Sequence, residues 1–394
     1  MSASFRTHWS LDPEVRYLNH GAFGACPTAV LQQQSELRAR LEAEPTRFLH
    51  REVEPLLDEA RAALAGFVDA DADDVAFVTN ATTGVNTVLR SLRFAPGDEL
   101  LTTDQEYNAS RNALDFVASQ WGAKVVVAKL PWPVPSADAV VDAVLAHVTP
   151  RTRLLLVDHV SSQTAVVMPV ARLAAALRER GVETLVDGAH APGMLPLSLR
   201  SLGVGYYTGN CHKWMCAPKG AAFLHVRKDL QPGIKPLVVS HGHNSTRTDR
   251  SRFRLDFDWL GTHDPSAALC VPHVIRFMGG LVPGGWPEVM RANREKALAA
   301  RKLLCARLKV APDCPEELVG SMVTVRLPDG FPVPPAPPLY VDPLHLRLFE
   351  EHRIEVPIVP WPKPPGRHVR VSAQLYNTHA EYQALGDALE ALLR

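Results

Sequence analysis

"TRLLLVDHV" (residues 152–160), "VARLAAALRERG" (170–181) and "VETLVDGAHAPG" (182–193) follow one another as an apolar run, an amphipathic stretch and a second apolar run. Short apolar runs bounded by polar residues predict buried strands, and the stretch between these two predicts a helix. A strand, a helix and a second strand in this order predict a right-handed crossover between parallel neighbours. The segment therefore predicts one unit of a parallel α/β sheet.

The same alternation extends toward the N-terminus, beginning near residue 74 with "DVAFVT" and "DELLTT". We therefore expect an α/β fold with a mainly parallel central sheet and helices on both faces. Ligands of such sheets bind beyond the carboxyl ends of the strands. Four polar segments fall there: "TNATTG" (79–84), "TDQEYN" (103–108), "DHVSSQ" (158–163) and "VDGAHAPG" (186–193).

The length of 394 residues exceeds what one core usually supports, so we expect two domains. Residues 1–65 predict an N-terminal segment with helices, residues 66–265 a large α/β domain, and residues 266–394 a smaller α+β domain, with the boundary near 265–285. Two proline-rich stretches, 327–343 and 356–366, predict either loops that close over a site or polyproline linkers.

Charge and composition exclude several classes of function. The formal net charge is +0, which argues against binding nucleic acid or membrane surfaces. The N-terminus has no apolar signal region and no run is long enough to span a membrane, so we expect a cytoplasmic protein. The six cysteines form no CxxC pair, and the spacing of Cys211 and Cys216 fits no zinc pattern, so we expect neither disulfides nor a metal.

The turn "TNATTGVN" (79–86) joins a predicted strand to a predicted helix. The backbone amides of Ala81, Thr82 and Thr83 are therefore expected at a helix N-terminus, where a phosphate binds readily. Asn and Thr also cap many helices that bind no ligand, so the turn alone leaves both interpretations open.

Asp187 and Lys213 point to a more specific chemistry. Asp187 ends an apolar strand at the ligand edge, where an acid needs a cationic partner, and Lys213 follows one short strand later in "TGNCHKWMCAPKG" (208–220). Pyridoxal 5′-phosphate (PLP) requires such a pair: a lysine that bonds to its aldehyde and an aspartate that keeps its ring nitrogen protonated. Tyr107 is placed where an aromatic face could stack on the ring.

The sequence resembles the class V branch of fold-type I PLP enzymes, which share the aspartate aminotransferase-like fold, and within it the isopenicillin N epimerase-like group. The resemblance covers nearly the whole chain and is most specific in "DQEYN", "VDGAHAPG", "HKWMCAPKG", "GTHD" and "RVSAQLYNT". It implies Lys213 as the Schiff-base lysine, Asp187 as partner of the ring nitrogen and Tyr107 as the stacking residue.

The resemblance also implies roles for residues around the cofactor and substrate. His190 would lie near the 3′-oxygen, and Thr262 would reach the phosphate of a neighbouring subunit in a homodimer with shared sites. Arg370 would bind the α-carboxylate of an amino-acid substrate, a bidentate role suited to arginine. The remaining positions are the phosphate residues Ala81, Thr82 and His212, and the substrate-pocket residues Asn19 and His20.

Two departures from the family pattern bear on function. Asn210 stands where serine is common, so its phosphate contact is in doubt, and no cysteine lies between the second proline cluster and Arg370. Sulfur relay through such a cysteine, as in cysteine desulfurases, is therefore not expected.

Three reactions fit these parts. Epimerisation leads on resemblance and needs a second acid, for which Tyr107 and the pair His241 and His243 are candidates, although the histidines also fit a hydrated loop. β-Elimination from a cysteine conjugate (a C–S lyase) and transamination are the alternatives. A cofactor-free scaffold of the same fold is the non-enzymatic one.

Overall fold

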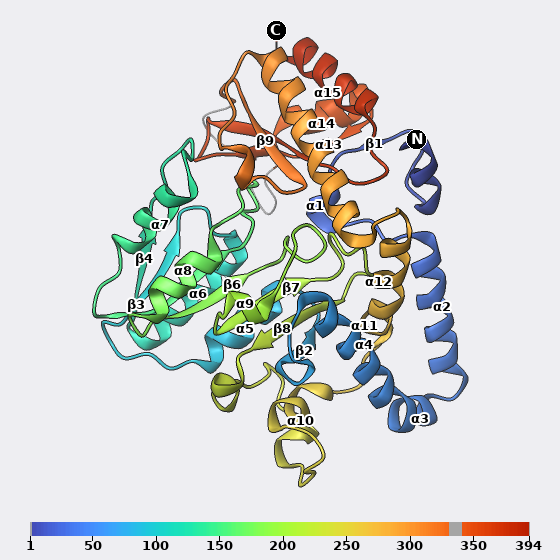
Figure 1. The fold of residues 1–394 in the computed structure, drawn as a ribbon, viewed down its shortest axis with the longest axis vertical. Coiled ribbons are helices and arrows are strands. Elements are labelled where there is room, and N and C mark those ends of the chain that lie inside the picture. The colour runs from blue at the N-terminus through green and yellow to red at the C-terminus, as the bar shows by residue number, and fades with distance from the viewer. Residues whose placement is uncertain (1, 331–340, 394) are drawn as a thin grey trace.

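A seven-stranded sheet lies at the centre of the computed structural model, which describes residues 2–330 and 341–393 (Figure 1). β8 (Ala222–Val226) is antiparallel to both of its neighbours, and the other pairings are parallel. The predicted mainly parallel sheet is therefore confirmed. The strand order is β2 (Val75–Val78), β8, β7 (Tyr206–Asn210), β6 (Glu183–Asp187), β5 (Thr152–Asp158), β3 (Glu99–Thr103) and β4 (Lys124–Ala128).

Alternating side chains along β5 supply two cores, one on each face of the sheet. Leu155 and Val157 pack in a core that includes α7 (Ala137–Leu145) and α8 (Val170–Arg178). Leu154 and Leu156 pack in a second core with α5 (Ala81–Ser91) and α6 (Asn108–Trp121). The expected helices on both faces are therefore present.

Further helices surround this sheet. Those before it are α1 (His20–Phe23), α2 (Thr28–Ala43), α3 (Pro45–Arg47) and α4 (Val53–Val68). Those after β6 are α9 (Leu199–Leu202), α10 (Arg252–Asp258), α11 (Ser266–Leu269) and α12 (Val271–Gly280). α2, α4, α11 and α12 extend the first core.

A second unit lies at the other end of the molecule in Figure 1. It contains the antiparallel sheet β11 (Ile358–Pro360), β12 (Arg367–Ser372) and β9 (Met322–Leu327), in that order. Its core combines these strands with α13 (Gly285–Leu308), α14 (Pro343–His352) and α15 (His379–Leu392). α13 packs in both cores, through Val289 and Leu304 respectively, so the exact domain boundary stays a prediction.

The N-terminal segment joins this second unit. β1 (Arg16–Tyr17) pairs in parallel with β10 (Ile354–Glu355), and Leu18 belongs to the core of this second unit. A further bridge links Asn19 to Ser372. Residues near position 19 therefore lie beside β12, which carries Arg370.

The proline-rich stretches differ in what can be said of them. Residues 331–340 of the first lie outside the described residues. The second, 356–366, includes β11, and its Trp361 packs edge-on against Trp132 with ring centroids 5.5 Å apart. This stretch is a packed part of the fold, so the linker interpretation is wrong for it.

Among the described residues, no single helix has the length and apolar composition needed to cross a bilayer. One bent pair, Ser266–Gly280 with Gly285–Leu308, meets those two criteria together.

Candidate active site

Lys213 lies three residues beyond β7, and its side chain is held among buried groups. Its Nζ lies 3.2 Å from Nε2 of His190, and the indole N–H of Trp214 donates to Nδ1 of the same histidine at 3.4 Å. Because Nδ1 accepts a hydrogen bond, a neutral His190 carries its proton on Nε2 and donates it toward Lys213. An amine that accepts this proton must itself be neutral.

The protonation of Lys213 agrees with this geometry. Burial lowers the pKa of Lys213 to about 8, against the opposing effect of Asp187. Burial also lowers the pKa of His190 well below its usual value, with Lys213 and Arg370 adding to the effect. An amine with a lowered pKa is partly neutral near pH 8, so it can attack a carbonyl and later accept a proton.

Asp187 ends β6, and both of its carboxylate oxygens are hydrogen-bonded. Ser110 donates to Oδ2 at 2.7 Å, and the Ala189 amide donates to Oδ1 at 3.0 Å. Burial nevertheless raises the pKa of Asp187, although the Ser110 hydrogen bond and Lys213 act in the opposite direction. A protonated pyridine nitrogen would supply the cation that this buried acid lacks. The residues present therefore fit PLP.

The predicted phosphate turn has the expected place but different contacts. α5 begins at Ala81, with Asn80 as its N-cap, and the Asn80 side chain accepts from the Thr83 amide at 2.8 Å. The Ala81 amide donates to Oδ1 of Asn210, also at 2.8 Å. Asn210 and two of the three predicted amides are thus engaged within the chain, whereas Thr82 stands at the start of the helix beside them. Asn210 therefore supports the turn, and a direct contact from it to the phosphate stays a prediction.

His212 lies on the loop that follows β7. Its Nδ1 is 3.2 Å from the carbonyl oxygen of Ala221, and burial lowers its pKa to about 4. The packing of this loop depends on Gly24, because a Cβ there would lie 2.0 Å from the His212 carbonyl oxygen and 3.0 Å from Lys213 Cα. Residues on the N-terminal segment therefore fix the backbone that carries Lys213.

The role of His20 in the substrate pocket stays a prediction. The resemblance implies a place in the substrate pocket, but His20 is fully buried, with Nδ1 at 2.9 Å from the Tyr376 hydroxyl and Nε2 at 3.0 Å from the Lys213 carbonyl oxygen. Both ring nitrogens are thus used inside the protein. His20 supports the Lys213 backbone. Asn19 donates through Nδ2 to Glu355 at 2.9 Å, and its buried Oδ1 has no partner within the described part of the chain.

Arg370 is buried in the middle of β12 and still has a hydrogen-bond donor available for a ligand. Its Nη1 donates to the carbonyl oxygen of Ser162 at 2.5 Å, while its Nε has no partner among the described residues. Burial lowers the pKa of Arg370 to about 10, and Tyr107 and Tyr17 oppose this effect electrostatically. A buried cation with an unsatisfied donor suits an anionic ligand.

The other candidates lie at the surface of the chain. Tyr107 is the N-cap of α6 and is 42% exposed, so its ring is accessible from solvent. Thr262 is exposed in the segment between α10 and α11. His241 and His243 are exposed in a turn that packs on α10, which fits the hydrated-loop interpretation.

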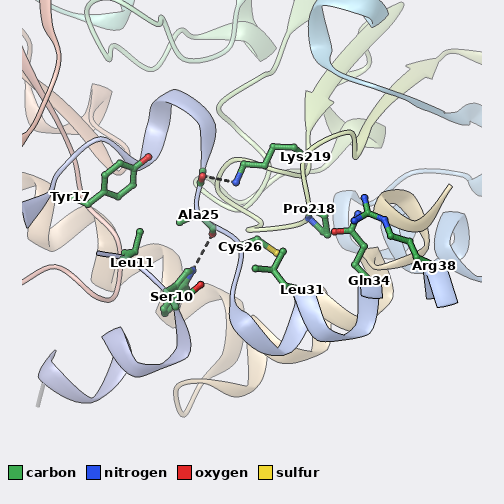
Figure 2. Close-up of a pocket in the computed structure, with 12 residues that line it drawn as sticks. Ser10, Leu11, Tyr17, Ala25, Cys26, Leu31, Gln34, Arg38, Pro218 and Lys219 are labelled. Atoms are coloured by element: carbon green, nitrogen blue, oxygen red, sulfur yellow. Dashed lines mark hydrogen bonds between the residues drawn. The ribbon is translucent and has the colours of Figure 1, made fainter. Parts of the chain in front are cut away.

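A cavity of about 450 Å³ is lined by neither Lys213 nor Asp187. Figure 2 shows it between the N-terminal segment, α2 and the loop that carries Pro218 and Lys219, where Lys219 donates to the Gly24 carbonyl oxygen at 2.9 Å. We place the candidate active site at the strand ends and not in this cavity, because Lys213, Asp187 and Arg370 converge there.

Sequence reasoning missed two buried acids at the same strand ends, Glu106 and Asp158. Both stand in the polar segments "TDQEYN" and "DHVSSQ", so a signal was present. Ser110 and Ser162 were missed as well, because nothing local shows that they contact Asp187 and Arg370.

Comparisons with known proteins agree on one family. The aminotransferase class-V family model matches residues 16–278. The chain is 39% identical to an isopenicillin N epimerase of Amycolatopsis lactamdurans, over 99% of this chain and 98% of the relative. It is 32% identical to a probable chloroplastic L-cysteine desulfhydrase of Arabidopsis thaliana, over 97% of this chain and 84% of the relative.

Solved structures share the fold. The cystine C–S lyase C-DES, in complex with its product cysteine persulfide, aligns with a TM-score of 0.79 at 22% identity, over 96% of this chain and 97% of the other. The cysteine desulfurase CsdA from Escherichia coli aligns with a TM-score of 0.79 at 20% identity, over 100% of this chain and 99% of the other. The predicted fold-type I architecture is confirmed.

Proposed function

Because the chain belongs to the class V aminotransferase family, we propose that it is a PLP-dependent enzyme that acts at the α-carbon of an amino acid or an amino-acid-containing peptide, as an epimerase. The observation that carries this proposal is the buried Lys213 amine, 3.2 Å from His190 and with a pKa lowered to about 8. The carboxylate of Asp187 acts on the same amine.

The cofactor is PLP, and the chain's own residues account for its binding. Lys213 supplies the amine for the covalent bond, Asp187 the anion for the ring nitrogen and Tyr107 the stacking face. Thr82 and His212 lie where the phosphate is expected. When bound, PLP supplies an electron sink that makes the α-proton of an amino acid acidic.

The proposed catalytic roles follow from the chemistry of each side chain. Arg370 binds the α-carboxylate and so orients the α-carbon. Lys213, released as a neutral amine, takes the α-proton. Tyr107 returns a proton to the opposite face of the α-carbon. Its hydroxyl can donate a proton, and its ring lies near enough to Arg370 to act on that residue electrostatically. Epimerisation requires both of these proton-transfer groups.

The relatives favour epimerisation over its alternatives. The epimerases of Amycolatopsis lactamdurans and Streptomyces clavuligerus are 39% and 38% identical to this chain, whereas two of the desulfhydrases are 33% and 32% identical to it. A C–S lyase is the second candidate, supported by those desulfhydrases and by the fold of C-DES. Transamination and a cofactor-free scaffold rank below these two.

Assembly and location stay predictions. A homodimer with shared sites is supported by the exposed Thr262, which the resemblance directs toward a neighbouring subunit. A cytoplasmic location belongs to the same proposal.

Proton NMR in D2O tests the reaction. The protein is incubated with PLP and a panel of L-amino acids, cysteine S-conjugates and aminoadipyl peptides, with Lys213→Ala as the matched control. Deuterium at the α-carbon together with loss of chirality, absent in the control, supports the epimerase. Pyruvate with a released thiol identifies a C–S lyase, a keto acid from the substrate identifies an aminotransferase, and no change with any substrate contradicts the proposed function.

A further inference from the structure

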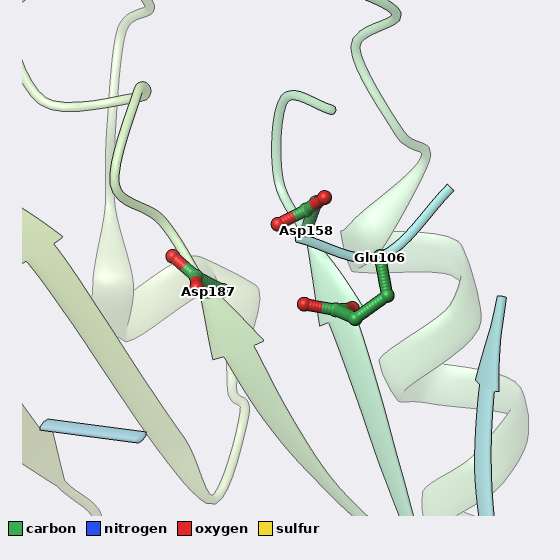
Figure 3. Close-up of side chains that lie close together, drawn as sticks. All are labelled: Glu106, Asp158 and Asp187. Carbon is green, nitrogen blue, oxygen red and sulfur yellow. The ribbon is translucent and has the colours of Figure 1, made fainter. Parts of the chain in front are cut away.

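Three carboxylates lie close together at the strand ends, as Figure 3 shows for Glu106, Asp158 and Asp187, and two of them, Asp158 and Asp187, act electrostatically on Lys213. Asp158 and Asp187 end the neighbouring parallel strands β5 and β6 and are directly opposite in register. Glu106 comes from the segment after β3. Ligand oxygens of all three lie within 4.8 Å of one another, and the residues are only 6%, 3% and 2% exposed, respectively.

The three acids differ in their hydrogen bonds. Asp187 accepts from Ser110 and from the Ala189 amide, so both of its oxygens are used. The Thr102 hydroxyl donates to Oε2 of Glu106 over a long distance, 3.4 Å, and the Tyr107 backbone also acts on this carboxyl. Among the described residues, Oε1 of Glu106 and Oδ2 of Asp158 have no hydrogen-bond donor. These last two carboxyl groups are themselves within hydrogen-bonding reach of each other.

Two carboxylates can hydrogen-bond to each other only if one of them carries a proton. Burial raises the pKa of Glu106 and of Asp158 well above their usual values, and the charge of Asp187 raises both further. Glu106 also raises the pKa of Asp158, whereas a hydrogen bond with Asp158 lowers the pKa of Glu106. Four groups from the surrounding elements also affect the pKa values of this pair: the Asp187 carboxylate, the Lys213 ammonium, the Tyr107 backbone amide and the Thr102 hydroxyl.

We propose that Glu106 and Asp158 share one proton, so that the pair keeps a single negative charge beside Asp187 and acts as a positioning unit for Lys213. The shared proton avoids three adjacent anions in a buried site. The remaining charge favours the protonated form of the Lys213 nitrogen, because Asp158 of this pair lies close enough to act on it electrostatically. The inference rests on the proposed function only because its test follows the visible absorption of bound PLP.

Conservative substitutions of Glu106 and Asp158 show how many negative charges the pair carries. Glu106→Gln removes one carboxyl, but the proton is then no longer needed and Asp158 stays ionised, so the net charge is unchanged. Asp158→Asn leaves Glu106 ionised in the same way. The double substitution removes the charge. Loss of an anion lowers the pKa of a neighbouring ammonium, by about 1 unit or more at such short range.

The readout is a spectrophotometric pH titration of the PLP-loaded protein, following the visible band due to the cofactor bonded to Lys213. We expect both single variants to titrate within about 0.3 unit of the wild type and the double variant to titrate at least about 1 unit lower. Asp115→Asn, which removes an exposed charge from α6, is the control for a general effect of charge.

Two results overturn the proposal. A downward shift in each single variant means that both acids are ionised, and an unshifted double variant means that both are neutral. A titration that shifts when the wild type is treated with a chelator, and recovers with Mg²⁺ or Ca²⁺, means that a cation and not a proton balances the cluster. Absence of any visible band in the wild type contradicts the proposed function instead, so the two failures are distinguishable. Thermal unfolding verifies that each variant folds. Infrared spectroscopy is a second test: the absorption of a protonated carboxyl should be present in the wild type and lost in each single variant.

Discussion

Replacing Arg370 tests how the substrate is held. Arg370 is 6% exposed and donates to Ser162 through Nη1, while its Nε has no partner among the residues that the structure describes, so donors are left for a carboxylate. In Arg370→Ala a bound substrate carboxylate remains buried without a partner. Truncating one member of such a pair costs about 2–5 kcal/mol. We therefore expect the dissociation constant for an amino acid to rise by about 30-fold to several thousand-fold.

The assay titrates the PLP-loaded protein with an α-methyl amino acid, which binds but has no α-proton to lose, and follows the visible spectrum. Arg370→Lys should show an intermediate loss, because it keeps the charge but not the planar pair of donors. Ser162→Ala, which removes only a 3.3 Å contact to the Ser162 hydroxyl, is the control and should change affinity by less than about threefold.

A second readout separates binding from folding. Arg370 lowers the pKa of Lys213, so its removal should move the Lys213 titration to higher pH. If Arg370→Ala binds the α-methyl amino acid as tightly as the wild type, Arg370 is not the carboxylate-binding residue and the proposed orientation of the substrate is wrong.

Three further changes test other parts of the site. Tyr107→Phe keeps the stacking ring but should lower epimerisation by about 10²–10⁴-fold while deuterium exchange with retained configuration continues; equal loss of both activities would remove Tyr107 as the second acid. Gly24→Ala, at φ +72 and against the His212 carbonyl, should cost at least about 1–2 kcal/mol of unfolding free energy in chemical denaturation, whereas Gly66→Ala, with nothing within 4 Å, should not destabilise; similar values for the two would contradict the close packing on Lys213. For Lys213→Met, the cofactor-free variant should melt above the wild type at pH 7. The Lys213 pKa falls from 10.5 to about 8 on folding, so the native state binds this proton less tightly and wild-type stability rises with pH between those values. A gain in melting temperature that did not shrink toward pH 10.5 would contradict the lowered pKa.

The sheet and the strand-end residues were predictable for a physical reason. Strand and helix periods are local, and parallel connections place strand ends on one edge, so the sequence alone assigns Asp187 and Lys213 to one site. β8 was not predicted, because a five-residue apolar run after a loop has no period that distinguishes it.

The contacts within the site were less predictable. Ser162 lies 208 residues from Arg370 along the chain, and His20 lies 193 residues from Lys213, so no local pattern indicates either pair. The interior position of His20 and the bond between Asn210 and Ala81 depend on how these segments pack. The proposed proton between Glu106 and Asp158 likewise depends on packing: strand register pairs Asp158 with Asp187, and the segment after β3 brings Glu106 beside them.

The central claim is that Lys213 is the residue that bonds to PLP. Reduction of the PLP-loaded protein with borohydride, followed by proteolysis and mass spectrometry, tests it most directly. The account predicts a pyridoxyl adduct on the peptide that carries Lys213, located on that residue by fragmentation and absent in Lys213→Ala. An adduct on another lysine, such as the neighbouring Lys219, or no adduct on any peptide, would contradict it.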